Sequence, residues 1–291
     1  MTVTETPLLF TCGDKELLGM LHLPQQPHQT RRTGVVVVVG GPQYRVGSHR
    51  QFLLLARFLS RHGVAVFRFD YRGMGDSEGD IGSFETVNDD IKAAVDTFMA
   101  NAPGVEQVML WGLCDAASAA LFYAHQDRRI SQLLLLNPWV RTEAGQAKAY
   151  LRHYYLQRVI DREFWAKLLS GRFDFRASLG SILSFIKTSR QGNVVERAEM
   201  DSHRPTPPLP LPERMLEGLN RFEGRARIII SGDDLTAAEF MDLVKSSKGW
   251  RKALKKRQTD FKHLEGANHT FSTQQWRDQV AEWSLEWIDI V

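Results

Sequence analysis

Residues 112–116 place a cysteine at a position where a sharp turn would present it as a nucleophile. The apolar, strand-prone run Val108–Trp111 leads into Gly112, and Cys114 comes just before small residues typical of a helix. This order of strand, turn and helix is that of a nucleophile elbow, whose usual pattern is G-x-S-x-G. The segment reads Gly-Leu-Cys-Asp-Ala here. A thiol is more acidic than a hydroxyl and becomes a good nucleophile once a base takes its proton.

A catalytic cysteine needs a base and a group that orients the base. Asp233, Asp234 and His269 each follow a predicted strand, as Cys114 does. His269 would take the thiol proton, and an aspartate would orient the imidazole and stabilise its charged form. We favour Asp234 because it lies deeper in its loop, with Asp233 as the alternative acid. The competing interpretation of Cys114 is a buried structural cysteine, which is common for free thiols.

The elements between these residues alternate strand and helix. Strands are expected at 7–12, 17–23, 34–39, 64–70, 108–111, 133–136, 226–232 and 259–264, and helices at 51–62, 83–100, 115–125, 237–245 and near the C-terminus. The first two strands form an antiparallel hairpin, and the continuous β-branched runs are typical of buried parallel strands. The pattern therefore predicts an α/β fold with a mostly parallel central sheet and helices on both faces. Reactive groups collect at the carboxyl ends of such strands.

The loop after the strand at 34–39 contains candidate donors for an oxyanion hole. It reads Gly-Gly-Pro-Gln over Gly40–Gln43. Glycine lets the backbone approach a substrate closely, whereas proline has no N–H to donate. The donor would therefore be Gly41 or Gln43, acting with the N–H of Asp115. A plain turn is the alternative.

Asp115 places a second carboxylate next to the thiol, and an ionised carboxylate there would oppose thiolate formation. We expect its side chain to point towards Arg45 or towards the substrate. Tyr44 and Arg45, which follow the Gly-Gly-Pro-Gln loop, are candidate substrate-binding residues.

Residues 139–222 interrupt the alternation with aromatic- and Arg-rich helical segments and a proline-rich stretch at 205–212. This pattern predicts a helical cap, with a Pro-rich return segment, inserted into a core made of residues 1–138 and 223–291. Tyr154 and Trp165 would line a substrate pocket, although most aromatics at helical spacing belong to a core. An accessory subdomain with no substrate role is the alternative.

Composition excludes several classes of protein. The 291 residues are 43% hydrophobic, and 37 basic against 34 acidic residues leave a net charge of +3, which gives no case for nucleic acid. The longest apolar run, Val35–Val39, is too short to span a membrane, and the N-terminus has no signal-peptide pattern. Two cysteines and no Cys/His cluster predict a cytoplasmic protein without disulfide, metal or cofactor. The oligomeric state stays open, a homodimer included.

Together these motifs resemble the α/β-hydrolase superfamily over nearly the full length of the chain. More narrowly, the chain resembles the exosortase A system-associated hydrolase type 1 family. The segments that carry the resemblance are 40–50, 69–79, 112–118, 231–237 and 269–272. The order nucleophile, acid, histidine is also that of α/β-hydrolases. The resemblance implies a bacterial cytoplasmic hydrolase encoded alongside exopolysaccharide and protein-sorting functions, and it implies no particular substrate.

We therefore predict a hydrolase or acyl transferase that cleaves an ester or thioester of a small-molecule or carrier-bound acyl substrate through an acyl-Cys114 intermediate. Peptide cleavage, and a non-catalytic carrier or binding protein on the same fold, are the alternatives. Cysteine for serine, Gly40 for histidine, Ala116 for glycine and Pro42 in the loop depart from the superfamily pattern. These departures argue against ordinary lipase activity.

Overall fold

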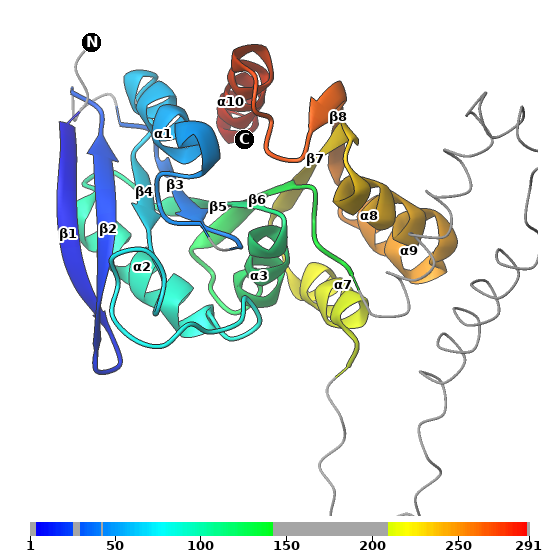
Figure 1. Cartoon of the computed structure of the whole chain (residues 1–291), viewed down its shortest axis with the longest axis horizontal. Coiled ribbons are helices and arrows are strands. Elements are labelled where there is room, and N and C mark those ends of the chain that lie inside the picture. Colours follow the sequence, from blue (N-terminus) through cyan, green and yellow to red (C-terminus); the bar gives the residue numbers. More distant parts are fainter. Residues whose placement is uncertain (1–3, 26–29, 42, 142–208, 290–291) are drawn as a thin grey trace, which may run out of the picture. The chain divides into compact units, whose positions relative to one another are not determined.

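The computed structural model describes residues 4–25, 30–41, 43–141 and 209–289. They contain an eight-stranded sheet with the order β1-β2-β4-β3-β5-β6-β7-β8 (Figure 1). The strands are β1 (Thr4–Cys12), β2 (Lys15–Leu23), β3 (Thr33–Val38), β4 (Val66–Phe69), β5 (Gln107–Leu113), β6 (Ile130–Leu136), β7 (Arg225–Asp233) and β8 (Asp260–Asn268). The hairpin β1–β2 and the pair β2–β4 are antiparallel, and the remaining pairs are parallel.

Helices cover both faces of this sheet. The helices are α1 (Gln51–Arg61), preceded by the 3-10 turn η2 (Ser48–Arg50), then α2 (Asn88–Asn101), α3 (Asp115–Ala124), α7 (Leu211–Arg221), α8 (Leu235–Ser246), α9 (Lys248–Lys256) and α10 (Gln274–Asp289). Figure 1 shows α1 and α10 on one face and α2, α3 and α7 on the other. The structure thus confirms the predicted α/β fold, in which a mostly parallel sheet lies between two helical layers.

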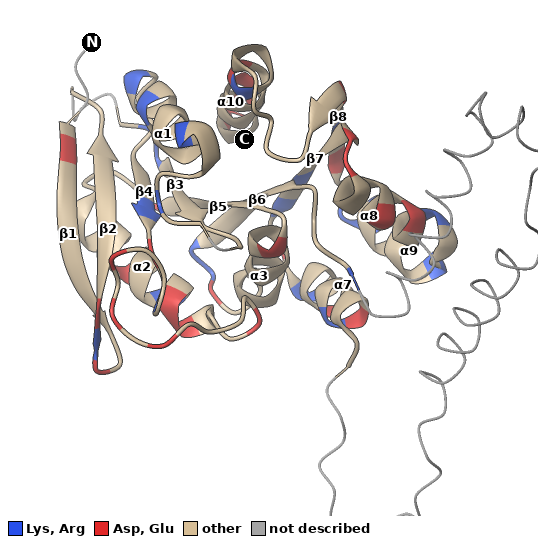
Figure 2. Cartoon of the chain, viewed as in Figure 1, with Lys and Arg blue, Asp and Glu red and all other residues tan. Residues whose placement is uncertain are grey.

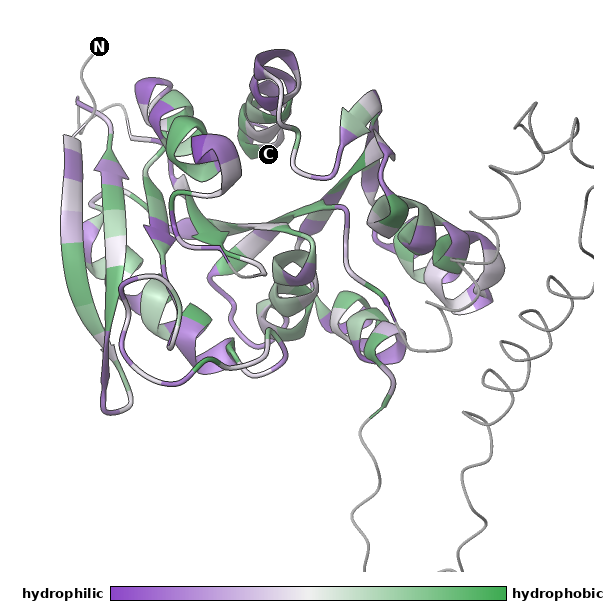
Figure 3. Cartoon of the chain, viewed as in Figure 1, coloured by the Kyte–Doolittle hydropathy of each residue, from purple (hydrophilic) through white to green (hydrophobic). Residues whose placement is uncertain are grey.

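The central strands form the core because both of their faces are covered. Val35–Val38 of β3 are fully buried, and every residue of β5 after Gln107 is buried. Figure 3 shows hydrophobic residues concentrated on the central strands and on the helix surfaces facing them. A parallel strand buried on both faces is expected to be apolar throughout rather than alternating. The valine run was therefore a reliable indication of the sheet centre.

Helix α2 begins at Asn88, five residues after the predicted start at Ser83. The residues between them form a turn in which Ser83 Oγ accepts the N–H of Glu85 at 3.2 Å and Ser83 O accepts the N–H of Thr86 at 2.9 Å. Local side-chain-to-backbone bonds of this kind compete with helix formation. Phe84 therefore lies outside the helix, and its ring stacks 6.4 Å from that of Phe122 in α3.

Two features at the C-terminal end of the sheet differ from the sequence prediction. Helix α9 was not predicted from the sequence. In the structure, the ring of Trp250 on its buried face packs edge-on against the ring of Phe240 of α8, with ring centroids 5.5 Å apart. Strand β8 continues to Asn268, through residues predicted to be a loop. Pairing with β7 extends this strand as far as Asn268, opposite Asp233.

The chain divides into two compact units, residues 1–140 with 212–291 and residues 141–211. Most of α7 belongs to the first unit, although the sequence prediction placed all residues up to 222 in the insertion. Met215 and Leu219 of α7 are buried, and the Arg214 guanidinium lies 4.5 Å above the Phe122 ring of α3. Pro212 fits the first turn of the helix, where an N–H has no intrahelical partner. The predicted cap lies largely in 142–208, outside the described residues.

Charged side chains lie mainly on the helices and loops around the sheet (Figure 2). Helix α9 carries five basic residues and no acidic one, whereas α8 carries Glu239, Asp242 and Lys245. In the part of the chain that the structure describes, no helix has the length and hydrophobicity needed to cross a membrane.

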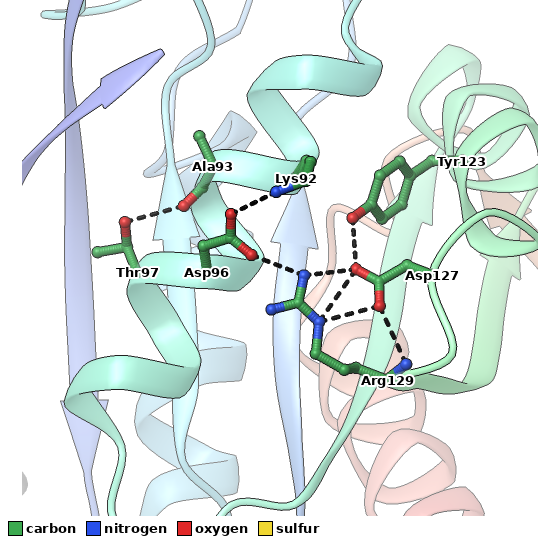
Figure 4. Close-up of polar contacts among 7 residues, drawn as sticks. All are labelled: Lys92, Ala93, Asp96, Thr97, Tyr123, Asp127 and Arg129. Carbon is green, nitrogen blue, oxygen red and sulfur yellow. Dashed lines mark hydrogen bonds and ion pairs between the residues drawn. The ribbon is translucent and has the colours of Figure 1, made fainter.

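A network of ion pairs links α2 to the turn between α3 and β6 (Figure 4). Asp127 accepts hydrogen bonds from the Tyr123 hydroxyl at 2.5 Å and from Arg129 Nη2 at 2.7 Å. Arg129 also pairs with Asp96 of α2 at 2.7 Å, and Asp96 pairs with Lys92 at 2.7 Å. Burial acts to raise the pKa of Asp127, but the bonds from Arg129 and Tyr123 outweigh it and lower the pKa to about 2.

This depressed pKa predicts that Asp127 stabilises the fold at neutral pH. The difference from the ordinary value of 3.8 corresponds to about 2 kcal/mol. The stabilisation is present above about pH 4 and is lost as the pH falls through about 2, because the folded-state pKa lies below the unfolded one. Asp127→Asn should therefore lower the free energy of unfolding at pH 7 by about 2 kcal/mol, as measured by urea denaturation.

The matched control is Asp96→Asn, since Asp96 also pairs with Arg129 but is 45% exposed. It should cost less than about 1 kcal/mol, as exposed ion pairs do. The Asp127 variant should also lose less stability than the wild type between pH 7 and pH 3. Equal costs for the two variants at pH 7 would contradict the assignment.

Candidate active site

Cys114 lies at the junction of β5 and α3 with a backbone conformation that residues other than glycine rarely adopt. Its φ is 64° and its ψ is −124°. The turn is tight, because a Cβ added at Gly112 would lie 2.7 Å from the backbone carbonyl group of Ala116. Only glycine fits at position 112, which explains the small residue that the elbow pattern requires there. The structure therefore forms the predicted strand, turn and helix around Cys114.

The elbow is held by hydrogen bonds to the neighbouring strand and to the segment that follows it. The N–H of Cys114 donates to Leu136 O of β6 at 2.9 Å. Its carbonyl oxygen accepts the N–H groups of Ala117 at 3.1 Å and Trp139 at 3.2 Å. Cys114 is partly buried and lies at the amino end of α3, where the helix dipole favours negative charge.

Asp234 and His269 form a hydrogen-bonded pair. His269 Nδ1 donates to Asp234 Oδ2 at 2.9 Å. Asp234 also caps α8, accepting the N–H groups of Thr236 at 3.3 Å and Ala237 at 3.0 Å. Burial acts to raise the pKa of Asp234, but the hydrogen bond from His269 and these N–H groups lower it overall. The carboxylate is therefore ionised and fixed in the position that orients the imidazole.

His269 in turn contacts the elbow cysteine. Its pKa is raised to about 10, first by the hydrogen bond to Asp234 and then by a hydrogen bond with the Cys114 side chain. The structure thus brings together Cys114, His269 and Asp234. Asp233, the alternative acid, is exposed at the end of β7. The imidazole is positioned between the Cys114 side chain and the Asp234 carboxylate.

Asn137 supports this arrangement and was not predicted from the sequence. It is fully buried, and its side-chain amide donates to Ser231 Oγ at 2.8 Å and to His269 O at 3.2 Å. Its Oδ1 accepts the N–H of Ser231 at 2.9 Å. Asn137 follows β6 directly, so the rule that identified the other polar residues at strand ends also applied to it.

The loop after β3 directs one of its predicted donors at the elbow. The N–H of Gly41 donates to Asp115 Oδ2 at 2.9 Å. Gln43, the other candidate donor, uses its side-chain oxygen to accept the N–H of Ser48 at 3.0 Å. Of the two alternatives, Gly41 therefore has its N–H beside the residue that follows the nucleophile.

The Asp115 carboxylate lies between this loop and α3. It does not point towards Arg45, which was one of the two directions expected from the sequence. Its Oδ1 accepts the N–H of Ala116 at 3.0 Å. Burial raises the pKa of Asp115, although N–H groups of Gly41, Ala116 and Asp115 itself and the charge of His269 act to lower it. The carboxylate is close enough to His269 to interact with it electrostatically.

The predicted substrate contacts have different environments. Arg45 has a 14% exposed side chain and forms ion pairs with Asp70, which is fully buried, and with Asp76 at 2.7 Å. Its guanidinium therefore holds two loops together. Tyr44 is 45% exposed beside Arg45. Tyr154 and Trp165 lie outside the described residues.

The chain matches a known protein family, and its fold matches solved structures. The model of the family described as "Serine aminopeptidase, S33" matches residues 30–223. The esterase Pf2001 of Pyrococcus furiosus superposes with a TM-score of 0.62 at 16% identity, over 98% of this chain and 94% of that one. Est1E from Butyrivibrio proteoclasticus, solved with ferulic acid bound, superposes with a TM-score of 0.60 at 14% identity, over 97% of both chains. Among curated protein sequences, none matches the chain.

The His269–Asp234 pair predicts how the imidazole titrates. In the wild-type protein, NMR of the ring C–H signals should show His269 titrating near pH 10. Asp234→Asn removes the largest cause of this rise, so the pKa should fall towards 6.5. Asp233→Asn is the matched control and should leave the titration near 10. A wild-type titration near 6.5, or equal shifts in both variants, would contradict the pairing.

Proposed function

Because the chain belongs to the serine aminopeptidase S33 family, we propose that it hydrolyses an ester or thioester, or transfers its acyl group, through an acyl-Cys114 intermediate. The observation that carries this proposal is the 2.9 Å hydrogen bond between His269 and Asp234, with the imidazole interacting with Cys114 at the end of β5. The family description names a serine enzyme, and this chain has cysteine at the elbow. A thiolate paired with an imidazolium is the chemical equivalent of serine with its base.

The acylation step follows from this geometry. The Cys114 sulfur attacks the carbonyl carbon of the substrate, and the carbonyl π electrons move to the oxygen to form an oxyanion. The intermediate collapses when the bond to the leaving alcohol or thiol breaks, and the leaving group takes the proton held by His269. The product is a thioester between the acyl group and Cys114.

Deacylation reverses the roles of the same groups. His269 takes a proton from water, the hydroxyl oxygen attacks the acyl carbon, and the Cys114 thiolate is expelled as the acid is released. An alcohol, thiol or amine in place of water would give acyl transfer instead. Asp234 keeps Nδ1 protonated and stabilises the imidazolium in both steps.

The substrate proposed here is a small-molecule or carrier-bound acyl group. Sulfur exchanges readily with a thioester, because the attacking and leaving groups are then chemically alike. The similarity to the exosortase A system-associated hydrolases supports a narrower proposal, in which this cytoplasmic enzyme serves exopolysaccharide and protein sorting. The departures at Gly40, Pro42 and Ala116 support a substrate different from a simple lipid ester.

Two other functions make different use of the same site. The family description includes aminopeptidase activity, so an amino-acid p-nitroanilide belongs in the substrate panel beside p-nitrophenyl and thioester substrates. A binding protein that has kept only the fold would turn over none of them. Covalent labelling of Cys114 distinguishes the enzyme from the binding protein.

Acyl transfer to Cys114 can be observed by mass spectrometry. The protein is mixed with p-nitrophenyl acetate and the reaction is quenched rapidly. The peptide containing Cys114 should then carry a 42 Da acetyl adduct, consistent with a covalent intermediate. Cys114→Ala should give no adduct and lose at least about 10³-fold in kcat, as nucleophile deletions do. Cys12→Ala is the control for non-specific labelling and should behave as wild type. Full turnover in Cys114→Ala would overturn the mechanism.

The two neighbouring acids should differ in their kinetic effects. Asp234→Asn removes the charge that holds His269, so kcat should fall by about 10²-fold or more. Asp233→Asn should stay within about twofold, since that side chain is exposed and forms no part of the pair. Steady-state kinetics with p-nitrophenyl acetate measure both. A larger loss for Asp233→Asn would reassign the acid.

A further inference from the structure

The side chain of Asp115 accepts one of the two N–H groups that would form an oxyanion hole. In this fold the hole consists of the N–H after the nucleophile and an N–H from the loop after β3. Here these are the N–H groups of Asp115 and Gly41. Gly41 donates to Asp115 Oδ2 at 2.9 Å. Ala116, one residue further along α3, donates to Oδ1 at 3.0 Å.

The surrounding backbone is shaped around this carboxylate. A Cβ added at Gly40 would lie 2.2 Å from Asp115 Oδ1 and 2.8 Å from Leu113 O. A glycine at position 40 therefore leaves the space in which the carboxylate lies. The superfamily pattern has histidine at this position, so Gly40 and Asp115 are departures that accommodate each other. The carboxylate is partly buried between the β3 loop and the first turn of α3, where it also interacts with the charge of His269.

We propose that the Asp115 carboxylate occupies the oxyanion hole in the resting enzyme, that a substrate must displace it before Cys114 is acylated, and that Asp115 thereby determines substrate specificity. This inference rests on the acyl-cysteine mechanism proposed above. A carboxylate and a developing oxyanion are both negative, and they compete for the N–H of Gly41. The donors act on the reaction only after the side chain has moved away.

The displaced carboxylate determines which substrates are favoured. It loses its backbone donors, and an ionised group in a confined site needs replacement hydrogen bonds. A substrate with an ammonium or hydroxyl group beside the scissile carbonyl supplies such a donor, whereas a plain alkyl ester does not. The specificity inferred here is therefore for acyl groups that carry a hydrogen-bond donor on the carbon next to the carbonyl.

The test compares two reactions of Cys114 that differ in their need for the oxyanion hole. Acylation by p-nitrophenyl acetate forms an oxyanion, whereas alkylation by iodoacetamide needs only the thiolate. Both reactions need the Cys114 thiolate, so the ratio of acylation to alkylation rate constants reports the contribution of the oxyanion hole independently of the thiolate concentration. Asp115→Ala frees the N–H of Gly41, so the ratio should rise by about 10- to 100-fold, below the roughly 10²- to 10³-fold that removing one oxyanion donor costs in other enzymes. Asp115→Asn keeps an acceptor oxygen without the charge and should give a smaller rise.

A second ester tests specificity. With p-nitrophenyl hydroxyacetate, which carries the α-hydroxyl donor, the gain in Asp115→Ala should be smaller than with the acetate ester. Glu265→Ala removes an exposed carboxylate four residues before His269 and should leave both ratios unchanged. Thermal melting of each variant shows that it is folded.

The outcomes separate the two levels of inference. An unchanged or lower acylation ratio in both Asp115 variants, with the wild type acylated, would overturn the displacement and leave the acyl-cysteine mechanism standing. An equal or larger gain with the hydroxyacetate ester would overturn the inferred specificity. Alkylation without acylation in every variant would overturn the proposed function, and the displacement with it.

Discussion

The site depends on the positive φ of a single residue that is not glycine. Cys114 has φ 64°, and such a conformation costs on the order of 1–3 kcal/mol unless its surroundings impose it. The hydrogen bonds to Leu136 and Trp139 and the close contact of Gly112 with α3 impose it here. This turn places Cys114 directly after β5 and at the amino end of α3.

The position of the turn within the sheet explains why the other groups converge on it. The chain crosses from β3 through α1 on one face, and from β5 through α3 on the other (Figure 1). The adjacent carboxyl ends of β3 and β5 are therefore a topological switch point, where open α/β sheets bind their ligands. The Gly40–Gly41 loop leaves β3 at this point, and Cys114 leaves β5. Asn137, at the end of β6, links the elbow side of the sheet to the carbonyl of His269.

Several groups at the site have a structural and a chemical role at once. Asp234 caps α8 and orients His269, so the helix start fixes the direction in which the imidazole points. Asp115 occupies the first turn of α3, where a carboxylate is favourable, and also accepts the N–H of Gly41 from the loop after β3. Arg45 joins the loop after β3 to the turn after β4 through Asp70 and Asp76. A chemical change at these positions therefore also affects the local fold.

The sequence alone determined the succession of strands along the chain, the buried parallel core and the polar residues at the strand ends. These features depend on local patterns, such as the valine run at 35–39 and the glycine at 112. It did not determine where α2 begins, because Ser83 hydrogen bonds to its own turn. Only the tertiary structure decided that Asp234 rather than Asp233 meets His269, and that Asp115 interacts with Gly41 rather than Arg45. The side chains of adjacent residues point in different directions, and contacts with segments distant in sequence decide which partner each side chain meets.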